Sequence, residues 1–176
     1  MSDKFIFHQL VKSGISDSTV IEAIFKVPRS KFFKYDDPSM LSTLVLTAHV
    51  CQLFSLTGQE KVLDLDPGTG FQAAVLSLLA GQVYIYVKDS QTAAAVRRRL
   101  YRLKYYNVRV LQKNDDLYNP GDSLYDAITS DTMFQQIPLS CRLQLKDGGS
   151  IVIVENSKDT HQLTRLIKSH NEYLIN

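Results

Sequence analysis

Residues 61–80 have the types and the order needed to bind a nucleotide-like ligand. A short apolar run at 62–65 carries one carboxylate, Asp64, and the turn that follows contains Gly68 and Gly70. A stretch rich in Ala, Leu and Val comes next, which predicts a strand, a glycine turn and a helix. The crevice above such a turn is where doubly wound α/β sheets bind nucleotides. The Gly-x-Gly pattern is common in turns, so it indicates a nucleotide site here only because it lies between a predicted strand and a predicted helix.

Asp64 is the best polar candidate for that crevice, because it stands near the end of the predicted strand. The alternative is a structural role, in which its carboxylate accepts hydrogen bonds from amides of the following turn. Asp131 and Thr132 follow the predicted fourth strand and would face the same crevice, whereas Asp126 starts that strand and favours a structural role.

Strands alternating with helices position these residues. We predict strands at 61–65, 82–87, 108–112, 125–130 and 150–154, with helices at about 71–80, 91–104 and 136–145. This alternation favours a mostly parallel sheet with helices on both faces. The residues from Ser157 onward predict either one more helix or an edge strand.

A helical region, residues 1–57, precedes this α/β core, residues 58–176. Ser16 or Asp17 is expected to cap a helix that continues through Ile24, and Pro28 is expected to end it. A second helix is predicted at 41–54. We expect the whole chain to form one domain, since 176 residues suffice to bury a core.

Composition narrows the function classes. Apolar residues make up 44% and charged residues 22%, with a net charge of +2. That charge is too small to indicate nucleic acid or a membrane surface as partner, and no apolar run suits a membrane span. Cys51 and Cys141 lack metal-ligand spacing. Without a charged-then-apolar leader, we expect a cytoplasmic protein without metal.

A basic run lies on the predicted helix 91–104, where Arg97, Arg98 and Arg99 are followed by Arg102 and Lys104. We interpret it as a solvated helix face with positive charge near its C-terminus. Nucleic-acid binding is the minor alternative, because tyrosines interleave with these bases.

Several stretches resemble protein-L-isoaspartate O-methyltransferases. They are Leu10-Val-Lys-Ser-Gly-Ile-Ser-Asp, Val20-Ile-Glu-Ala-Ile, Val27-Pro-Arg followed by Phe32, Gly68-Thr-Gly-Phe-Gln-Ala-Ala-Val-Leu, Tyr125-Asp-Ala-Ile, Ile137-Pro and Gly148-Gly. The resemblance covers nearly the whole chain. It implies the three-layer, Rossmann-like class I methyltransferase fold, S-adenosylmethionine as cofactor, and isoaspartyl carboxylates of damaged proteins or peptides as substrate.

The resemblance also implies roles for individual residues. Ser42 matches a family serine that helps methyl transfer, although a helix N-cap is an equally good interpretation of it. The cofactor-binding positions that it implies are Asp64, Gly68, Thr69, Gly70, Gln72, Asp89 and Asn114.

The chain departs from the family pattern at ligand positions. Asp66 and Pro67 replace the first residues of the glycine loop, adding negative charge and removing an amide donor. Val87 stands where an acidic residue should bind the ribose, and Asp89 lies about 6–7 Å further along an extended strand. Lys113-Asn114-Asp115 replaces Gly-Asp-Gly, where Asn114 can still accept from an adenine amino group.

The segment from Lys34 to Met40 is shorter than its family counterpart, which forms part of the substrate-side wall, and the chain after Glu155 is shortened too. We therefore expect a family homologue with weak cofactor affinity and impaired activity. Two alternatives are a fully active methyltransferase with a rearranged turn, and a non-catalytic binding or interaction protein that kept the scaffold.

Overall fold

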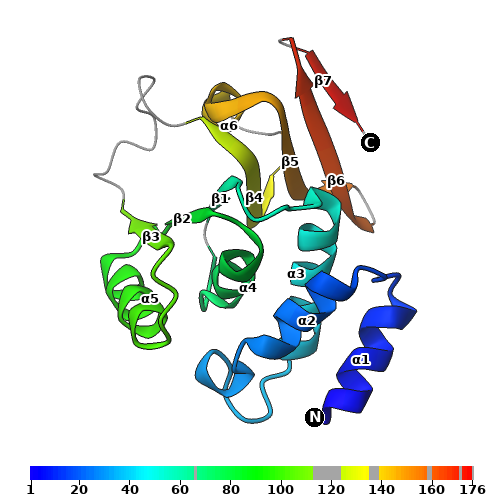
Figure 1. Ribbon diagram of the computed structural model, residues 1–176, viewed down its shortest axis with the longest axis vertical. Helices are drawn as coiled ribbons and strands as arrows, with labels where there is room; N and C mark the ends of the chain where they lie inside the picture. Colours follow the sequence, from blue (N-terminus) through cyan, green and yellow to red (C-terminus); the bar gives the residue numbers. More distant parts are fainter. Residues whose placement is uncertain (66, 113–123, 135–138, 158–159, 171, 176) are drawn as a thin grey trace.

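A seven-stranded sheet forms the centre of the protein. The computed structural model describes residues 1–65, 67–112, 124–134, 139–157, 160–170 and 172–175 (Figure 1). The strand order is β3-β2-β1-β4-β5-β6-β7. Pairings among the first five strands are parallel, whereas β6 runs antiparallel to β5 and β7 antiparallel to β6. The mostly parallel sheet that the sequence predicts is thus confirmed.

The strands begin close to the predicted positions. They are β1 (Lys61–Leu65), β2 (Gln82–Tyr86), β3 (Val108–Leu111), β4 (Tyr125–Phe134), β5 (Leu145–Ser157), β6 (Thr160–Ser169) and β7 (Glu172–Ile175). The largest extension is in β5, which starts five residues earlier than expected because Leu145 already pairs with Tyr125 before the register shifts. For the C-terminal residues, the edge-strand alternative is correct, and there are two strands.

Four helical segments precede β1: α1 (Asp3–Lys12), α2 (Ser18–Lys26), the short 3-10 helix η1 (Arg29–Lys31) and α3 (Met40–Phe54). Asp17 caps α2, as one of the two predicted caps, because its Oδ1 accepts from the backbone N–H of Thr19 at 2.9 Å. Val27 is extended with ψ of 123° ahead of Pro28, which ends the helix as expected.

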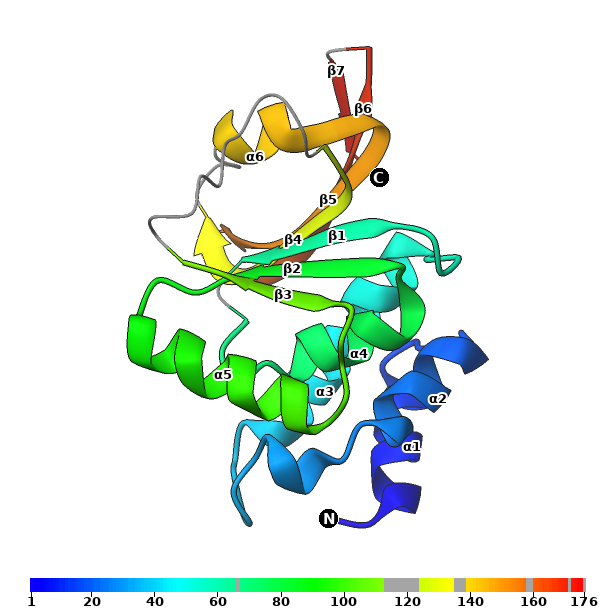
Figure 2. The ribbon, with the colours of Figure 1, turned by 60° about the vertical axis from the view of Figure 1, so that its left-hand side comes forward.

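The helices between strands are α4 (Phe71–Leu79), α5 (Ser90–Arg102) and α6 (Leu139–Gln144). Figure 2 shows α2, α3, α4 and α5 on one side of the sheet and α6 on the other. The larger hydrophobic core lies on the first side and joins α1–α5 to the sheet, whereas Leu63, Ile128, Leu145 and Ile151 centre a smaller cluster on the second. None of the described helices combines the length and hydrophobicity that crossing a bilayer requires.

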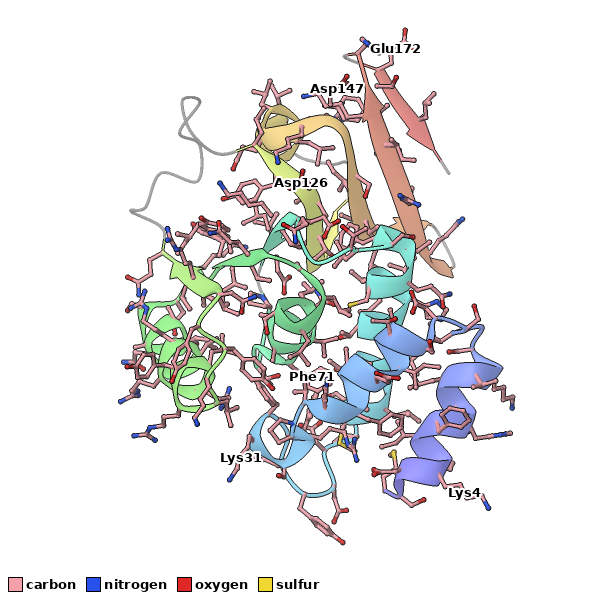
Figure 3. The ribbon with its side chains drawn as sticks, in the orientation of Figure 1. Lys4, Lys31, Phe71, Asp126, Asp147 and Glu172 are labelled. Carbon is pink, nitrogen blue, oxygen red and sulfur yellow. The ribbon has the colours of Figure 1, made fainter. Side chains whose placement is uncertain are left out.

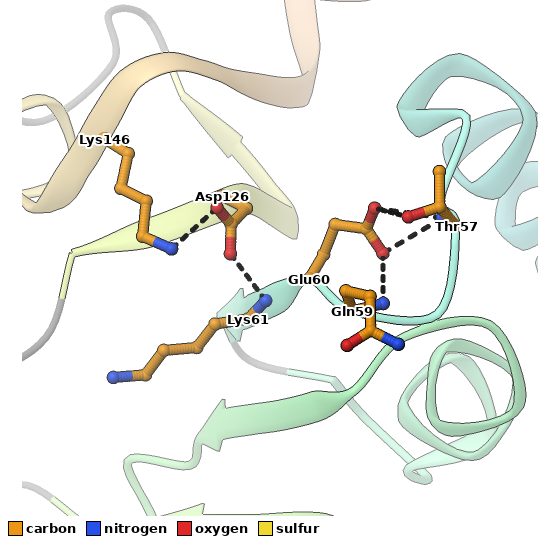
Figure 4. Close-up of polar contacts among 6 residues, drawn as sticks. All are labelled: Thr57, Gln59, Glu60, Lys61, Asp126 and Lys146. Atoms are coloured by element: carbon orange, nitrogen blue, oxygen red, sulfur yellow. Dashed lines mark hydrogen bonds and ion pairs between the residues drawn. The ribbon is translucent and has the colours of Figure 1, made fainter.

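Hydrogen bonds that two carboxylates accept fix the amino end of the sheet (Figure 4). Asp126 accepts from the backbone N–H of Lys61 and from Nζ of Lys146, each at 2.7 Å, and so ties β4 to β1 and β5. Glu60 accepts from the backbone N–H groups of Thr57, Gly58 and Gln59 at 2.9–3.1 Å. Asp126 therefore has the structural location that the sequence favours.

Candidate functional site

The turn after β1 keeps the backbone that its glycines predict. Gly68 has φ of 54° and Gly70 has φ of 82°, and this left-handed region strongly favours glycine. The N–H of Gly70 donates to the carbonyl of Pro67 at 2.9 Å, which closes the turn just before α4. A Cβ on Gly70 would lie 2.9 Å from Cγ1 of Val96, whereas one on Gly68 would meet nothing within 4 Å.

Asp64 and Gln72 form a buried pair beneath this turn. Asp64 is fully buried and Gln72 is 1% exposed, and Nε2 of Gln72 donates to Oδ1 of Asp64 at 3.2 Å. Thr129, also fully buried, lies beside Asp64 in the strand register. The pair joins the end of β1 to the first turn of α4, so both predicted cofactor residues contribute to the same local arrangement.

Cys51 on α3 lies near the buried Asp64. Burial raises the pKa of its thiol well above the ordinary value, and the negative charges of Asp64 and Asp17 raise it further. The thiol is therefore protonated at neutral pH and is an inert core group.

Two side chains after β2 differ sharply in their surroundings. Val87, at the expected ribose position, is 3% exposed, and its N–H donates to the carbonyl of Leu111. Asp89 is exposed and is the N-cap of α5, where its Oδ2 accepts from the backbone N–H of Thr92 at 2.6 Å. Hydrogen bonds from Thr92 hold the pKa of Asp89 below its usual value.

Arg99 and three aromatic side chains support the turn from the outside. Nη1 of Arg99 donates to the carbonyl of Thr69 at 2.7 Å. The ring of Phe71 contacts those of Phe32 and Phe33, with centroids 5.7 and 5.2 Å away. The sequence interpretation missed Arg99, although its position three residues after the buried Val96 and four before Leu103 indicates an arginine at the border of the buried face.

Ser42 lies in the first turn of α3 and is exposed. Its Oγ donates to the carbonyl of Ser39 at 2.8 Å, and Ser39 is itself the N-cap residue. The N-cap interpretation of Ser42 is therefore wrong. A hydroxyl in the third helical position finds the carbonyl three residues back instead of a free N–H group.

Some candidate residues lie outside the described part. Asn114 and Asp66 are among them, and the side chains of Asp131 and Thr132 are as well, although both residues belong to β4. The described site thus unites Asp64, Gly68, Thr69, Gly70 and Gln72 at one turn and places Asp89 at the start of α5.

The seven-stranded, mostly parallel sheet with its N-terminal helices has the fold of the α/β methyltransferases. A solved protein-L-isoaspartate O-methyltransferase superposes with a TM-score of 0.78 at 24% identity, covering 99% of this chain and 62% of that one. A Plasmodium falciparum protein described as a beta-aspartate methyltransferase, solved with S-adenosyl-L-homocysteine, gives 0.76 at 16% identity, covering 99% of this chain and 95% of that one.

Sequence comparison narrows the class to one family. The family model described as protein-L-isoaspartate(D-aspartate) O-methyltransferase (PCMT) matches residues 1–176. Protein-L-isoaspartate O-methyltransferase 2 of Geotalea uraniireducens is 31% identical over 96% of this chain and 84% of its own length, and the Geobacter metallireducens enzyme is 30% identical over 95% and 84%. The chain belongs to the PCMT family.

The residues present fit a bound S-adenosyl cofactor only in part. Gly68, which has a positive φ and open space where a Cβ would lie, leaves room for a ligand to approach the backbone of the turn. At the position where the family resemblance predicts a ribose ligand, by contrast, Val87 offers a buried isopropyl group that cannot accept a hydrogen bond from a hydroxyl.

Proposed function

We propose that this chain is a PCMT-family protein with a weakened cofactor site and little or no isoaspartyl methyltransferase activity. The single observation that carries the proposal is the contrast between the environments of Val87 and Asp89, which follow β2. Val87 is apolar and buried, and the nearest carboxylate, Asp89, caps α5. Loss of a charged hydrogen-bond partner typically costs about 1.5–3 kcal/mol, or one to two decades in affinity.

The chemistry of the family makes this loss decisive. The bound cofactor would supply the reactive methyl group, and the isoaspartyl carboxylate is ionised at neutral pH without help. The protein therefore contributes mainly by holding the two groups in line, and small misplacement is expensive in rate. The segment from Lys34 to Met40 is mostly exposed, and we expect it to enclose a substrate less than the longer family segment would.

A second candidate is the full family activity, with isoaspartyl proteins or peptides as substrates. The positive-φ Gly68 and Gly70 and the intact Asp64–Gln72 pair favour it, because they preserve the turn that would receive the cofactor. The non-catalytic alternative keeps the same scaffold as a binding protein.

Calorimetric titration with S-adenosylhomocysteine tests the proposal first. We expect a Kd weaker than about 100 µM. Val87→Glu combined with Asp66→Gly and Pro67→Thr should tighten binding at least about tenfold, because it restores an acceptor for the ribose and removes a like charge. Micromolar binding by the unmodified chain would contradict the proposal, and so would a folded triple variant with no gain.

Transfer of radiolabelled methyl groups to an isoaspartyl peptide tests the activity directly, with the normal aspartyl peptide as control. We expect no detectable transfer at saturating cofactor. Because Ser42 is not a cap, Ser42→Ala should change the free energy of unfolding by less than about 0.5 kcal/mol. Turnover specific to the isoaspartyl form, and lost in Ser42→Ala, would establish the full family activity instead.

A further inference from the structure

A basic pocket lies between α5 and η1. Its volume is about 690 Å³, and it is lined by Lys31, Ala95, Arg98, Arg99, Arg102 and Leu103. Figures 1 and 2 both show the second half of α5 beside η1, and Figure 3 shows Lys31 on η1. Two elements from distant parts of the sequence thus bring four cationic side chains around one cavity.

Among the residues that the structure describes, no ion pair neutralises these charges. Helix α5 (Ser90–Arg102) contains no acidic residue. Within the described ranges, neither an ion pair nor a hydrogen bond engages the side chains of Lys31, Arg98 and Arg102. Arg98 and Arg102 are four residues apart on one helix face, where like charges repel each other. A bound anion would relieve this repulsion.

Arg99 forms the inner wall of the pocket and is held in place. Its Nη1 donates to the carbonyl of Thr69, and its Cζ lies 5.8 Å from the centroid of the Phe32 ring. A guanidinium carries five N–H donors, so this one bond leaves others available to a ligand. The pocket therefore contains one preorganised donor group beside two exposed arginines.

We propose that this pocket binds a di- or triphosphate group next to the cofactor turn. Guanidinium groups match phosphate oxygens in a bidentate geometry, and three arginines with a lysine suit an anion of several charges. The apolar lining is limited to Ala95 and Leu103, which gives little attraction to a large apolar ligand. The phosphate chain is the recognised group, whether it is free or belongs to a nucleoside triphosphate.

Calorimetric titration of the full chain at low ionic strength tests the proposal, with inorganic tripolyphosphate and ATP as separate probes. We expect tripolyphosphate to bind in a one-to-one ratio and more weakly as salt is added. Equal affinities for the two probes would assign recognition to the phosphates, and tighter binding of ATP would add a nucleoside contact. Absence of tripolyphosphate binding would overturn the proposal.

Matched variants locate the site on α5. Arg98→Gln and Arg102→Gln should each weaken tripolyphosphate binding about tenfold, whereas Arg97→Gln should change it less than about twofold. Arg97 is the control because it adjoins Arg98 but donates to the carbonyl of Val110, outside the pocket. Circular dichroism checks that each variant folds. Equal losses in all three variants, or binding of single-stranded DNA but not of tripolyphosphate, would overturn the proposal.

Discussion

Gly70 lies in the turn after β1 and packs against helix α5. Two independent constraints meet there: the backbone is left-handed, and a Cβ at this position would lie only 2.9 Å from Cγ1 of Val96. Gly68 has the first constraint without the second, since its Cβ would enter open space. This pair of glycines therefore separates the cost of conformation from the cost of packing.

We expect Gly70→Ala to lower the free energy of unfolding by about 2–4 kcal/mol, as the sum of backbone strain and overpacking. Gly68→Ala should lower it by only about 1–2 kcal/mol. Urea denaturation measures both values. Val96→Ala should recover part of the loss in the Gly70→Ala background, as a double-mutant cycle would show. Equal losses at the two glycines would mean that Val96 moves away freely.

Glu60 organises an element, the loop that leads from α3 into β1. Its carboxylate accepts from three consecutive backbone N–H groups and from the hydroxyl of Thr57 at 2.6 Å. Partial burial alone would raise the pKa of Glu60, but hydrogen bonds from Thr57 and the neighbouring backbone together lower it by more, so the net pKa lies below the ordinary value. Ionised Glu60 thus favours the folded loop.

The sign of the pH dependence follows from this lowered pKa. The stabilisation is fully present above the unfolded-state pKa, about 4.3, and is lost as the pH falls through the folded value. We expect Glu60→Gln to lower the free energy of unfolding by about 1–2 kcal/mol at neutral pH, and the difference from the natural chain to shrink below about pH 4. Urea denaturation across this range measures it.

Glu22→Gln is the matched control for this experiment. Glu22 is exposed on α2, so its neutralisation should change stability little at any pH. A Glu60→Gln deficit that stays constant down to low pH would contradict the role of the carboxylate charge.

The sequence predicts elements well where local pattern decides them. Residues 61–65 and the start of α4 at Phe71 match the prediction because an apolar run, a glycine turn and a breaker-free stretch agree with one another. After Ser157 the pattern is ambiguous, since Leu163, Leu166 and Ile167 also have helical spacing. Pairing with β5 makes this segment a strand and not a helix. Such pairing between strands cannot be inferred from the local pattern.

In the site, too, local features were predictable from the sequence, whereas contacts between distant residues were not. Its turn glycines were predictable from their place between strand and helix, but the bond from Arg99 to Thr69 spans 30 residues. The sequence presents three consecutive arginines, and the spacing of Arg99 from Val96 and Leu103 places it at the border of the buried face without showing that the turn accepts its hydrogen bond. The cap on α5 was equally hidden, because Asp89 could serve either a ligand or the helix.

For the molecule as a whole, the strand order has a consequence for how the chain folds. β5, β6 and β7 follow one another in the sequence and in the sheet, so short loops suffice to form them. β1 pairs on one side with β2, which follows it closely in the sequence, but its other edge must wait for β4, since the bond between Lys61 and Asp126 joins residues 65 positions apart. Closing the loop between these two residues costs chain entropy before the contacts between β1 and β4 can compensate for it.

During synthesis, the apolar edge of β1 therefore stays open until β4 has emerged, and in this interval the nascent chain is most exposed to aggregation. In refolding experiments, we expect amides of the β5–β6 hairpin to gain protection from pulsed hydrogen exchange before those of β1. Earlier protection of β1 would contradict this order. It would show that the helices, α4 among them, assemble the β3-β2-β1 half of the sheet first.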